Sequence, residues 1–386
     1  MQIARTAARL ACAGILIALG GCSTLSSLNP FAKAPKNAPA ALVDFKPTMS
    51  VRTAWTASVG NSDEFVFSPA LAGDSLYAAS ANGTIMRINP ASGQQVWRTA
   101  ADMRLTAGVG SDGNTVVVAG EKGVILAFDG NGKLRWKAQA SSEILSSPAV
   151  GQGVVIVRSV DNRITAYDAE SGNRRWFVQR SAPALTLRNA PGITIAGPAA
   201  FVALPGGKLV ALALNNGAPL WEAAVSDPRG ATELERIADT AGSPVVLGRE
   251  VCAASYQGKV ACFDASNGAP RWSKELSSDV GVAVDERFVF AADEHGVVTA
   301  FTRDSGASMW RNNKLANRRL SAPVSFGRAV AVGDRQGYVH FLSREDGAFL
   351  ARVATDGSAI VAAPVVTGSG IVFQTKAGQV VALTTE

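Results

Sequence analysis

The sequence feature that most constrains the fold is a Gly-x-x-x-Trp motif. It occurs six times, at Gly93–Trp97, Gly132–Trp136, Gly172–Trp176, Gly217–Trp221, Gly268–Trp272 and Gly306–Trp310. Together with Trp55, these motifs account for all seven tryptophans, at spacings of 42, 39, 40, 45, 51 and 38 residues. A period of this size indicates one supersecondary unit that is copied along the chain and buries its faces against neighbouring copies.

Each repeat contains a hairpin signal before its tryptophan. A glycine is followed by alternating apolar residues and a polar stop, as in 83–89, 123–129 and 258–264, and Asn162 takes the place of the glycine once. Glycine and asparagine tolerate a left-handed turn position, so each marks the tip of a β-hairpin. A further apolar run and a short segment that often contains Ser-Pro or Ala-Pro precede the hairpin. Each unit therefore predicts four strands, which is the blade of a β-propeller.

The two ends of the chain predict how the ring closes. There are eight hairpin tips but seven tryptophans, and the eighth tryptophan position is Ala351, four residues after Gly347. Trp55 has no hairpin before it, whereas the last repeat, 361–383, has no outer strand after it. We therefore expect residues 51–59 to supply that strand, which closes an all-β, eight-bladed propeller of four-stranded blades and removes its open edges. The tryptophans are expected to form the core between blades.

The N-terminus predicts export. Arg5 and Arg9 precede a short apolar run, 13–19, and then Leu19-Gly20-Gly21-Cys22. This pattern is typical of a secretory signal peptide and resembles the bacterial lipobox, which implies that Cys22 is lipidated. The alternative is an ordinary signal peptide with an incidental cysteine. We expect a signal peptide over 1–21, a lipidated cysteine and Pro-rich tether over 22–50, and the propeller over 51–386. Because Ser23 follows the cysteine, the resemblance implies sorting to the outer membrane.

Charge and catalytic residue types exclude several functions. The net charge of +6 falls to +4 without the signal peptide, and no basic stripe interleaved with aromatics indicates nucleic-acid binding. The two histidines, His295 and His340, are expected to be solvated residues of a turn and a strand. Aspartates that follow hairpin strands, such as Asp129 and Asp168, are expected to cap turns. The sequence predicts no catalytic residues, no metal site and no cofactor.

Cys252 and Cys262 flank one hairpin. A two-residue turn would place them on opposite faces, whereas a three-residue turn, 256–258, would make them direct partners. The repeated form of the tips favours the three-residue turn. In an oxidising compartment this register predicts a disulfide, and the alternative is a pair of buried thiols.

Two consecutive repeats are longer than the others, with periods of 45 and 51 residues. The additional residues fall in 179–193 and 225–241, at the same position of the repeat, where insertions commonly build a binding surface. The first segment contains Leu185, Leu187 and Arg188, a composition typical of protein–protein hot spots. The second is expected to form a short helix or turn rich in charge. The alternative is that both loops fold back onto the propeller.

Taken together, these features resemble the BamB family, the lipoprotein subunits of the outer-membrane β-barrel assembly machine. The resemblance implies a non-catalytic scaffold that is lipid-anchored in the outer membrane and faces the periplasm. It also implies that Leu185, Leu187, Arg188 and Asp239 bind the POTRA domains of BamA. A second aspartate is frequent in the family where this chain has Ala241. A further implied partner is the unfolded outer-membrane protein, which would pair with exposed sheet edges.

Two other functions compete with this interpretation. The repeats also resemble those of quinone-dependent dehydrogenases, which typically bring an adjacent cysteine pair and acidic calcium ligands. This chain contains no adjacent cysteines. The other competitor is a ligand-binding lipoprotein outside the assembly machine.

Overall fold

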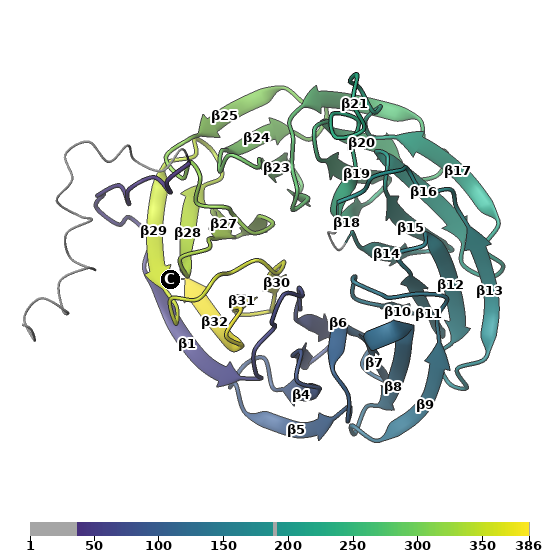
Figure 1. Ribbon diagram of the computed structural model, residues 1–386. Helices are drawn as coiled ribbons and strands as arrows, with labels where there is room; N and C mark the ends of the chain where they lie inside the picture. The colour runs from purple at the N-terminus through teal and green to yellow at the C-terminus, as the bar shows by residue number, and fades with distance from the viewer. Residues whose placement is uncertain (1–36, 188–190, 386) are drawn as a thin grey trace, which may run out of the picture. The chain divides into compact units, whose positions relative to one another are not determined.

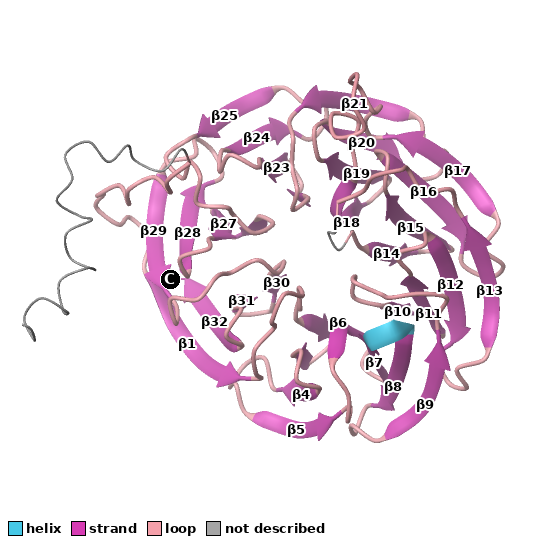
Figure 2. Ribbon diagram, in the orientation of Figure 1, coloured by secondary structure: helices cyan, strands magenta, loops and turns pink. Residues whose placement is uncertain are grey.

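The described part of the chain is a ring of eight four-stranded antiparallel sheets (Figure 1). The structure is a computed structural model, and it describes residues 37–187 and 191–385. A single 3₁₀ turn, Glu121–Gly123, accompanies the strands and loops of this part (Figure 2). Within it, no helix has the length and apolar character needed to cross a membrane. The eight-bladed β-propeller expected from the repeats is confirmed.

Blades 1 to 4 come from the first half of the chain. Blade 1 is β2 (Ala70–Ala72), β3 (Ser75–Ala79), β4 (Thr84–Ile88) and β5 (Gln95–Ala100); blade 2 is β6 (Leu105–Ser111), β7 (Thr115–Gly120), β8 (Val124–Asp129) and β9 (Leu134–Gln139); blade 3 is β10 (Ala149–Gly151), β11 (Val154–Arg158), β12 (Arg163–Asp168) and β13 (Arg174–Gln179); blade 4 is β14 (Ile193–Ala196), β15 (Ala199–Leu204), β16 (Lys208–Ala213) and β17 (Pro219–Ala224).

Blades 5 to 8 complete the ring. Blade 5 is β18 (Thr240–Leu247), β19 (Glu250–Ser255), β20 (Lys259–Asp264) and β21 (Pro270–Glu275); blade 6 is β22 (Val282–Val284), β23 (Phe288–Ala292), β24 (Val298–Thr302) and β25 (Ser308–Asn312); blade 7 is β26 (Val324–Phe326), β27 (Ala329–Gly333), β28 (Tyr338–Ser343) and β29 (Phe349–Ala354); blade 8 is β30 (Val365–Val366), β31 (Ile371–Gln374), β32 (Gln379–Thr385) and β1 (Val51–Ser58).

Within each blade the strands run outward from the centre of the ring, and the fourth strand lies at the rim (Figure 1). Blade 8 is built from both ends of the chain. Its outer strand, β1, pairs antiparallel with β32, from Val51 opposite Thr385 to Ser58 opposite Gln379. The predicted closure by the N-terminal strand is therefore confirmed, and blade 8 has no open edge at β32.

The tryptophans join successive blades. The indole N–H of each donates to the backbone carbonyl that follows the third strand of the next blade, at 2.8–3.0 Å. The pairs are Trp55 with Pro90, Trp97 with Gly130, Trp136 with Ala169, Trp176 with Leu214, Trp221 with Ala265, Trp272 with Arg303 and Trp310 with Arg344. The expectation that they form the core between blades is confirmed.

The glycine of each motif receives the tryptophan of the preceding blade. Gly172 has φ +73°, and a Cβ atom added there would lie 2.6 Å from the ring of Trp136. A side chain at this position would therefore be both strained and in collision with the ring. Within one motif, the glycine therefore contacts the preceding blade and the tryptophan contacts the following blade. In blade 8 the third and fourth strands, β32 and β1, come from opposite ends of the chain, so no turn joins them and no glycine of this kind is present. Correspondingly, blade 7 has Ala351 at the position of the tryptophan.

The ring has two faces, which we name by their connections. The loop face carries the segments that lead from each outer strand to the next blade, together with the tips of the second-to-third-strand hairpins. These meet through backbone bonds such as Val225 N–H to Gly207 O, 2.8 Å. The opposite face carries the tight turns. There Asp129 accepts the N–H groups of Asn131 and Lys133, which confirms that it caps its turn and which lowers its pKa.

The propeller unit begins at Pro39, whereas the sequence places its start at Val51. We call residues 39–50 the strap. It contacts blade 7 through backbone bonds, such as Thr48 N–H to Leu350 O at 3.0 Å. The signal peptide over 1–21 and most of the expected tether lie outside the described residues.

Candidate functional site

The two long loops occupy neighbouring positions on the loop face. Loop A, residues 180–192, joins β13 of blade 3 to β14 of blade 4, and loop B, residues 225–239, joins β17 of blade 4 to β18 of blade 5. The structure describes all of loop B and all of loop A except 188–190. Loop A therefore leads into the first strand of blade 4, and loop B leaves its last strand.

Asp239 ties the two loops together. Its Oδ2 accepts the N–H of Leu187 at 2.5 Å, and its Oδ1 accepts the N–H of Gly206, in the hairpin tip of blade 4, at 2.9 Å. The side chain is buried, with an exposed fraction of 1%. The assignment of Asp239 as a partner contact stays a prediction, and in this structure both of its oxygens are used inside the molecule. The carboxylate positions loop A.

A buried arginine lies beneath loop A, and the sequence analysis missed it. Arg158, at the end of β11, donates from Nη1 to Asn162 Oδ1 at 2.9 Å, and Asn162 Nδ2 donates to the carbonyl of Ser181 at 3.3 Å. Burial lowers the pKa of Arg158 to about 10, and the charge of Asp239 acts in the opposite direction. The signal available in the sequence was Asn162, which replaces the glycine of the other hairpin tips.

The loops leave apolar side chains exposed. Leu185 has an exposed fraction of 44%, and Leu187 is half-buried. Loop B contributes Leu234, which is 67% exposed and which sequence reasoning did not single out. Arg188 lies outside the described residues. Each of the two neighbouring loops thus carries one exposed leucine, a side chain suited to contact with a protein partner.

Loop B forms a turn over residues 233–236, one of the two expected conformations. Glu235 accepts the N–H groups of Ala231 and Thr232 at 2.8 and 3.1 Å, and these bonds, that of Thr232 first, lower its pKa. Arg236 donates to the carbonyl of Gly230 at 3.1 Å. These bonds fold the charged side chains back on the loop and present Leu234 at its tip.

Cys252 and Cys262 are direct partners across β19 and β20, with a disulfide between them and a Cα–Cα distance of 4.1 Å. The register expected from a three-residue turn is confirmed. Both residues are fully buried and pack with Trp272 and Phe301 in the core between blades 5 and 6. The disulfide is therefore part of the core and lies away from the exposed surface of the loops.

The two histidines differ. The side chain of His295 is 76% exposed, as expected, but the expectation of a solvated His340 is wrong, because the side chain is fully buried. His340 Nε2–H donates to Asp334 Oδ2 at 2.8 Å, and the Nε of Arg318 donates to the same oxygen at 2.7 Å. Burial lowers the pKa of His340, and the bond to Asp334 opposes the shift. The four central residues of β28, from Val339 to Leu342, are all buried, so neither face of the strand at His340 is open to solvent.

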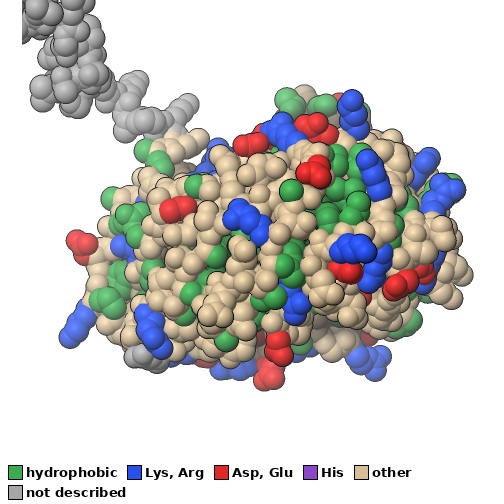
Figure 3. All heavy atoms as spheres, turned by 90° about the horizontal axis from the view of Figure 1, so that it is seen from below, with side chains coloured by type: hydrophobic (Ala, Val, Ile, Leu, Met, Phe, Trp, Pro, Cys, Tyr) green, Lys and Arg blue, Asp and Glu red, His purple; other side chains and the backbone are tan. Residues whose placement is uncertain are grey.

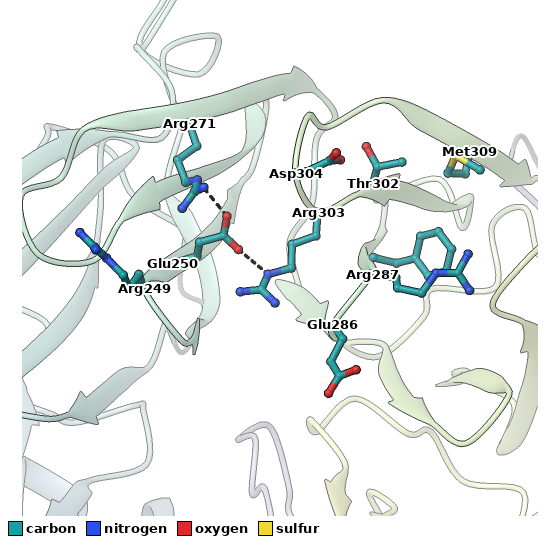
Figure 4. Close-up of a pocket in the computed structure, with 10 residues that line it drawn as sticks. Arg249, Glu250, Arg271, Glu286, Arg287, Thr302, Arg303, Asp304 and Met309 are labelled. Carbon is teal, nitrogen blue, oxygen red and sulfur yellow. Dashed lines mark hydrogen bonds and ion pairs between the residues drawn. The ribbon is translucent and has the colours of Figure 1, made fainter.

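A cleft of about 550 Å³ lies on the opposite face, between blades 5 and 6 (Figure 4). Its lining contains Arg249, Arg271 and Arg303 together with Glu250. The buried carboxylate of Glu250 bonds to Arg271 Nε at 2.9 Å and to Arg303 Nε. Within the cleft, Glu250 is therefore shared by two arginines, whereas Arg249 and Arg287 of its lining pair with Asp264 and Glu345 outside it. None of the residues expected to bind a partner lines it.

Two further features of the described residues concern metal ligands and surface charge. Within residues 37–187 and 191–385, no three His, Cys, Asp or Glu side chains are grouped as metal ligands. On the side shown in Figure 3, positive and negative side chains are interspersed among apolar ones. Such mixing lacks the basic stripe that tracks a phosphate backbone.

Comparison with known proteins identifies the family. The family model described as outer membrane protein assembly factor BamB matches residues 81–312 and 294–386. A protein of that name from Bordetella pertussis is 47% identical over 95% of this chain and 94% of its own. The crystal structure of BamB from Moraxella catarrhalis superposes with a TM-score of 0.78 at 27% identity, over 87% of this chain and 100% of that one.

The quinohemoprotein alcohol dehydrogenase of Comamonas testosteroni has a TM-score of 0.69 at 14% identity, over 86% of this chain and 76% of its own. This likeness concerns the fold alone, which enzymes and scaffolds can share. The family match and the identity to curated relatives carry the assignment. The chain belongs to the BamB family of outer membrane protein assembly factors.

Proposed function

We propose that this protein is a non-catalytic scaffold of the outer-membrane protein assembly complex, and that loops A and B bind the POTRA domains of BamA. The observation that carries the proposal is the joint construction of the two loops. Asp239 bonds to both Leu187 and Gly206, and Leu185 and Leu234 remain exposed. The names of the relatives support membership of the assembly complex and association with the outer membrane.

The exposed leucines are the contact residues in this proposal. Burying a leucine in an interface contributes roughly 1.5–3 kcal/mol, so two leucines with an arginine supply a hot spot of useful size. Because Leu185 and Leu234 are already held on ordered loops, binding costs less conformational entropy than it would for mobile segments. Leu187 and Arg188 extend the same loop, and we include them in the surface.

Asp239 has a different role from the leucines. It acts through the backbone of Leu187 and keeps loop A in its binding conformation. Removing the carboxylate leaves two N–H groups without their acceptor, which costs about 1–3 kcal/mol for each group. Asp239→Ala is therefore expected to weaken binding and also to lower the melting temperature.

Binding of purified POTRA domains to single variants tests the proposal. Leu185→Asp and Arg188→Glu are expected to abolish copurification without changing the thermal melt, because Leu185 is exposed and neither change removes a described core contact. The matched control is Leu134→Asp, since Leu134 is 51% exposed on β9, away from both loops. If the two loop variants bind as well as the control, the assigned surface is incorrect.

The proposed anchor is a lipid on Cys22, with a tether from Cys22 to the strap and the propeller in the periplasm. Multiple acyl chains hold a protein stably on a membrane, since each buried CH₂ contributes about 0.8 kcal/mol. Cys22→Ala is expected to move the protein from the membrane fraction to the soluble fraction. Retention of the variant in the membrane fraction would argue against the anchor.

The rim of the ring favours a second, separate proposal, that unfolded outer-membrane proteins pair with the outer strands. Large apolar side chains stand exposed on several of these edge strands: Val96, Leu134, Phe177, Leu220 and Met309. An open edge with apolar neighbours is the surface to which an extended segment adds by main-chain bonds. Site-specific crosslinking from Leu220 to an unfolded client tests it, with exposed Arg249 as the control position.

A further inference from the structure

We propose that the strap is an intramolecular clamp that replaces the missing eighth tryptophan and locks blade 7 to blade 8. Seven of the eight junctions between blades contain a tryptophan whose indole N–H bonds to the next blade. At the junction of blades 7 and 8 the equivalent residue is Ala351, which pairs with Phe341 as Trp310 pairs with Ala300. This junction needs another source of apolar burial.

The strap supplies that burial through Met49. Met49 is 6% exposed and belongs to the same buried cluster as Ala351, Ile371 and Leu383, which come from blades 7 and 8. The N–H of Met49 also bonds to the carbonyl of Leu350 at 3.2 Å. A flexible thioether side chain fills an irregular gap well, so methionine suits the place of the absent indole.

The strap also covers the outer strand of blade 7. The residue before the tryptophan is largely exposed in other blades, where Val96, Leu220 and Met309 have exposed fractions of 54%, 52% and 51%. The equivalent residue of β29, Leu350, is only 7% exposed. Its carbonyl accepts N–H groups from Thr48 and Met49. The strap thus covers β29, the edge strand of blade 7, at Leu350.

Two arginines hold the strap by its backbone, one on β29 of blade 7 and one in the connection from blade 6 to blade 7. Arg352 Nη2 donates to the carbonyl of Val43 at 2.9 Å, and its guanidinium lies 5.1 Å from the ring of Phe45, which stacks on Phe349 at 5.2 Å. Arg318 Nη1 donates to the carbonyl of Ala40 at 2.8 Å. Arg318 is itself fixed by Asp334, so the buried charge cluster of blade 7 serves to hold the strap.

The path of the strap determines where the chain enters the propeller. Ala40 contacts Ala316, in a connection of the loop face, whereas Thr48 contacts Arg328, in a turn of the opposite face. The strap therefore crosses blade 7 from the loop face to the opposite face before β1 begins. The entry point at Ala40 lies on the face that carries loops A and B.

Hydrogen–deuterium exchange on the full-length chain tests the clamp. In the unmodified protein, the bonded amides of Ala40, Thr48 and Met49 are expected to exchange at least about tenfold more slowly than free amides. In Phe45→Ala/Met49→Ala, we expect exchange of the strap and of β31 and β32 to accelerate about tenfold or more, because buried apolar contacts are lost. The matched control is Val96→Ala/Leu134→Ala, which truncates exposed rim residues and should leave both regions unchanged.

Two results would overturn the clamp. One is rapid exchange of the strap amides in the unmodified protein. The other is an outcome in Phe45→Ala/Met49→Ala in which the strap exchanges quickly but β31 and β32 keep their protection and the melting temperature is unaltered. That outcome would show that the strap lies on blade 7 without stabilising its junction with blade 8.

Ala351→Trp gives a second test, which adds a side chain at the junction instead of removing one. A tryptophan at this position occupies the site that Met49 shares, so we expect it to release the strap, with exchange of amides 40–49 rising about tenfold while β31 and β32 stay protected. If the strap of this variant remains as protected as in the unmodified protein, Met49 does not substitute for the tryptophan, and the proposal is wrong.

Discussion

The ring of Trp221 lies directly over Gly268 of the next blade, so close that a Cβ atom on the glycine would be 2.7 Å from it. Gly268 also has φ +72°. We predict that Gly268→Ala lowers the free energy of unfolding by about 2–4 kcal/mol, because the strain of a left-handed alanine adds to overpacking. Urea denaturation measures the change.

Gly197→Ala separates the two causes. Gly197 has φ +54°, but a Cβ atom added to it would have no atom within 4 Å. Only the backbone strain is expected there, about 1–2 kcal/mol. Equal losses in the two variants would show that the contact with Trp221 contributes nothing.

The second prediction concerns pH. His340 is buried between Asp334, Arg318, Arg352 and Tyr338, and its Nδ1 accepts the Nε–H of Arg352 at 3.4 Å, which requires the neutral ring. Burial lowers the pKa of folded His340 below 6.5, so the unfolded chain takes up the proton first as the pH falls. The free energy of unfolding should therefore fall below pH 6.5 with a contribution of up to about 1.4 kcal/mol per pH unit from this residue.

His340→Gln should remove this contribution between about pH 7.5 and 5. Burial raises the pKa of Asp334, but the bonds from His340 and the Tyr338 N–H outweigh it and keep the pKa below 3.8. The stability that Asp334 contributes is therefore present at about pH 5 and is lost only at lower pH. His295→Gln is the matched control, because that side chain is exposed, and it should keep the unmodified pH dependence. Identical slopes in both variants would refute the assignment to His340.

The third prediction concerns the disulfide. Mass spectrometry of the unreduced protein is expected to show Cys252 linked to Cys262. Closing a loop of this length constrains the unfolded chain by about 2–3 kcal/mol, so Cys252→Ala/Cys262→Ala should lower the free energy of unfolding by at least that amount. A reductant should destabilise the unmodified protein and leave the double variant unchanged. Detection of two free thiols in the oxidised protein would be inconsistent with this prediction.

The fourth prediction concerns the cleft of the opposite face. Glu250→Gln keeps the shape of the buried side chain but removes the charge that Arg271 and Arg303 share. We expect a loss of about 1–3 kcal/mol in unfolding free energy, because hydrogen bonds to charged groups in buried positions are the stronger ones. Glu345→Gln is the matched control: its partner Arg287 and Glu345 are 61% and 58% exposed, and no measurable change is expected. A Glu250 variant as stable as the control would contradict the role of this pair.

The repeat made most of the fold predictable. The spacing of Trp97 and Trp136, the hairpin glycines and the unmatched Trp55 were sufficient for the blade count and for the closure by β1, because each is a local pattern with one geometric meaning. The strap was not predictable in the same way. It forms no strand, and contacts with distant residues such as Arg352 and Leu350 hold it in place.

The loops were located correctly by the long periods, but the division of roles within them required coordinates. Leu185 and Asp239 are both chemically suited to a binding surface. A sequence does not distinguish an exposed carboxylate from one that bonds to Leu187 and Gly206, since that difference depends on how two loops meet. Arg158 was missed for the same reason, because its partners come from other segments of the ring.

The pairing of β1 with β32 sets an order of events during folding. β1 lies near the start of the chain and its partner at the end, so the outer strand of blade 8 stays unpaired until the last strand is available. Blades 1 to 7 can form from consecutive chain, whereas the final blade requires contacts across the full length of the sequence, which fold slowly. Until β32 is in place the protein is thus an incomplete ring, in which the strand that begins the chain's propeller still lacks its only neighbour within blade 8.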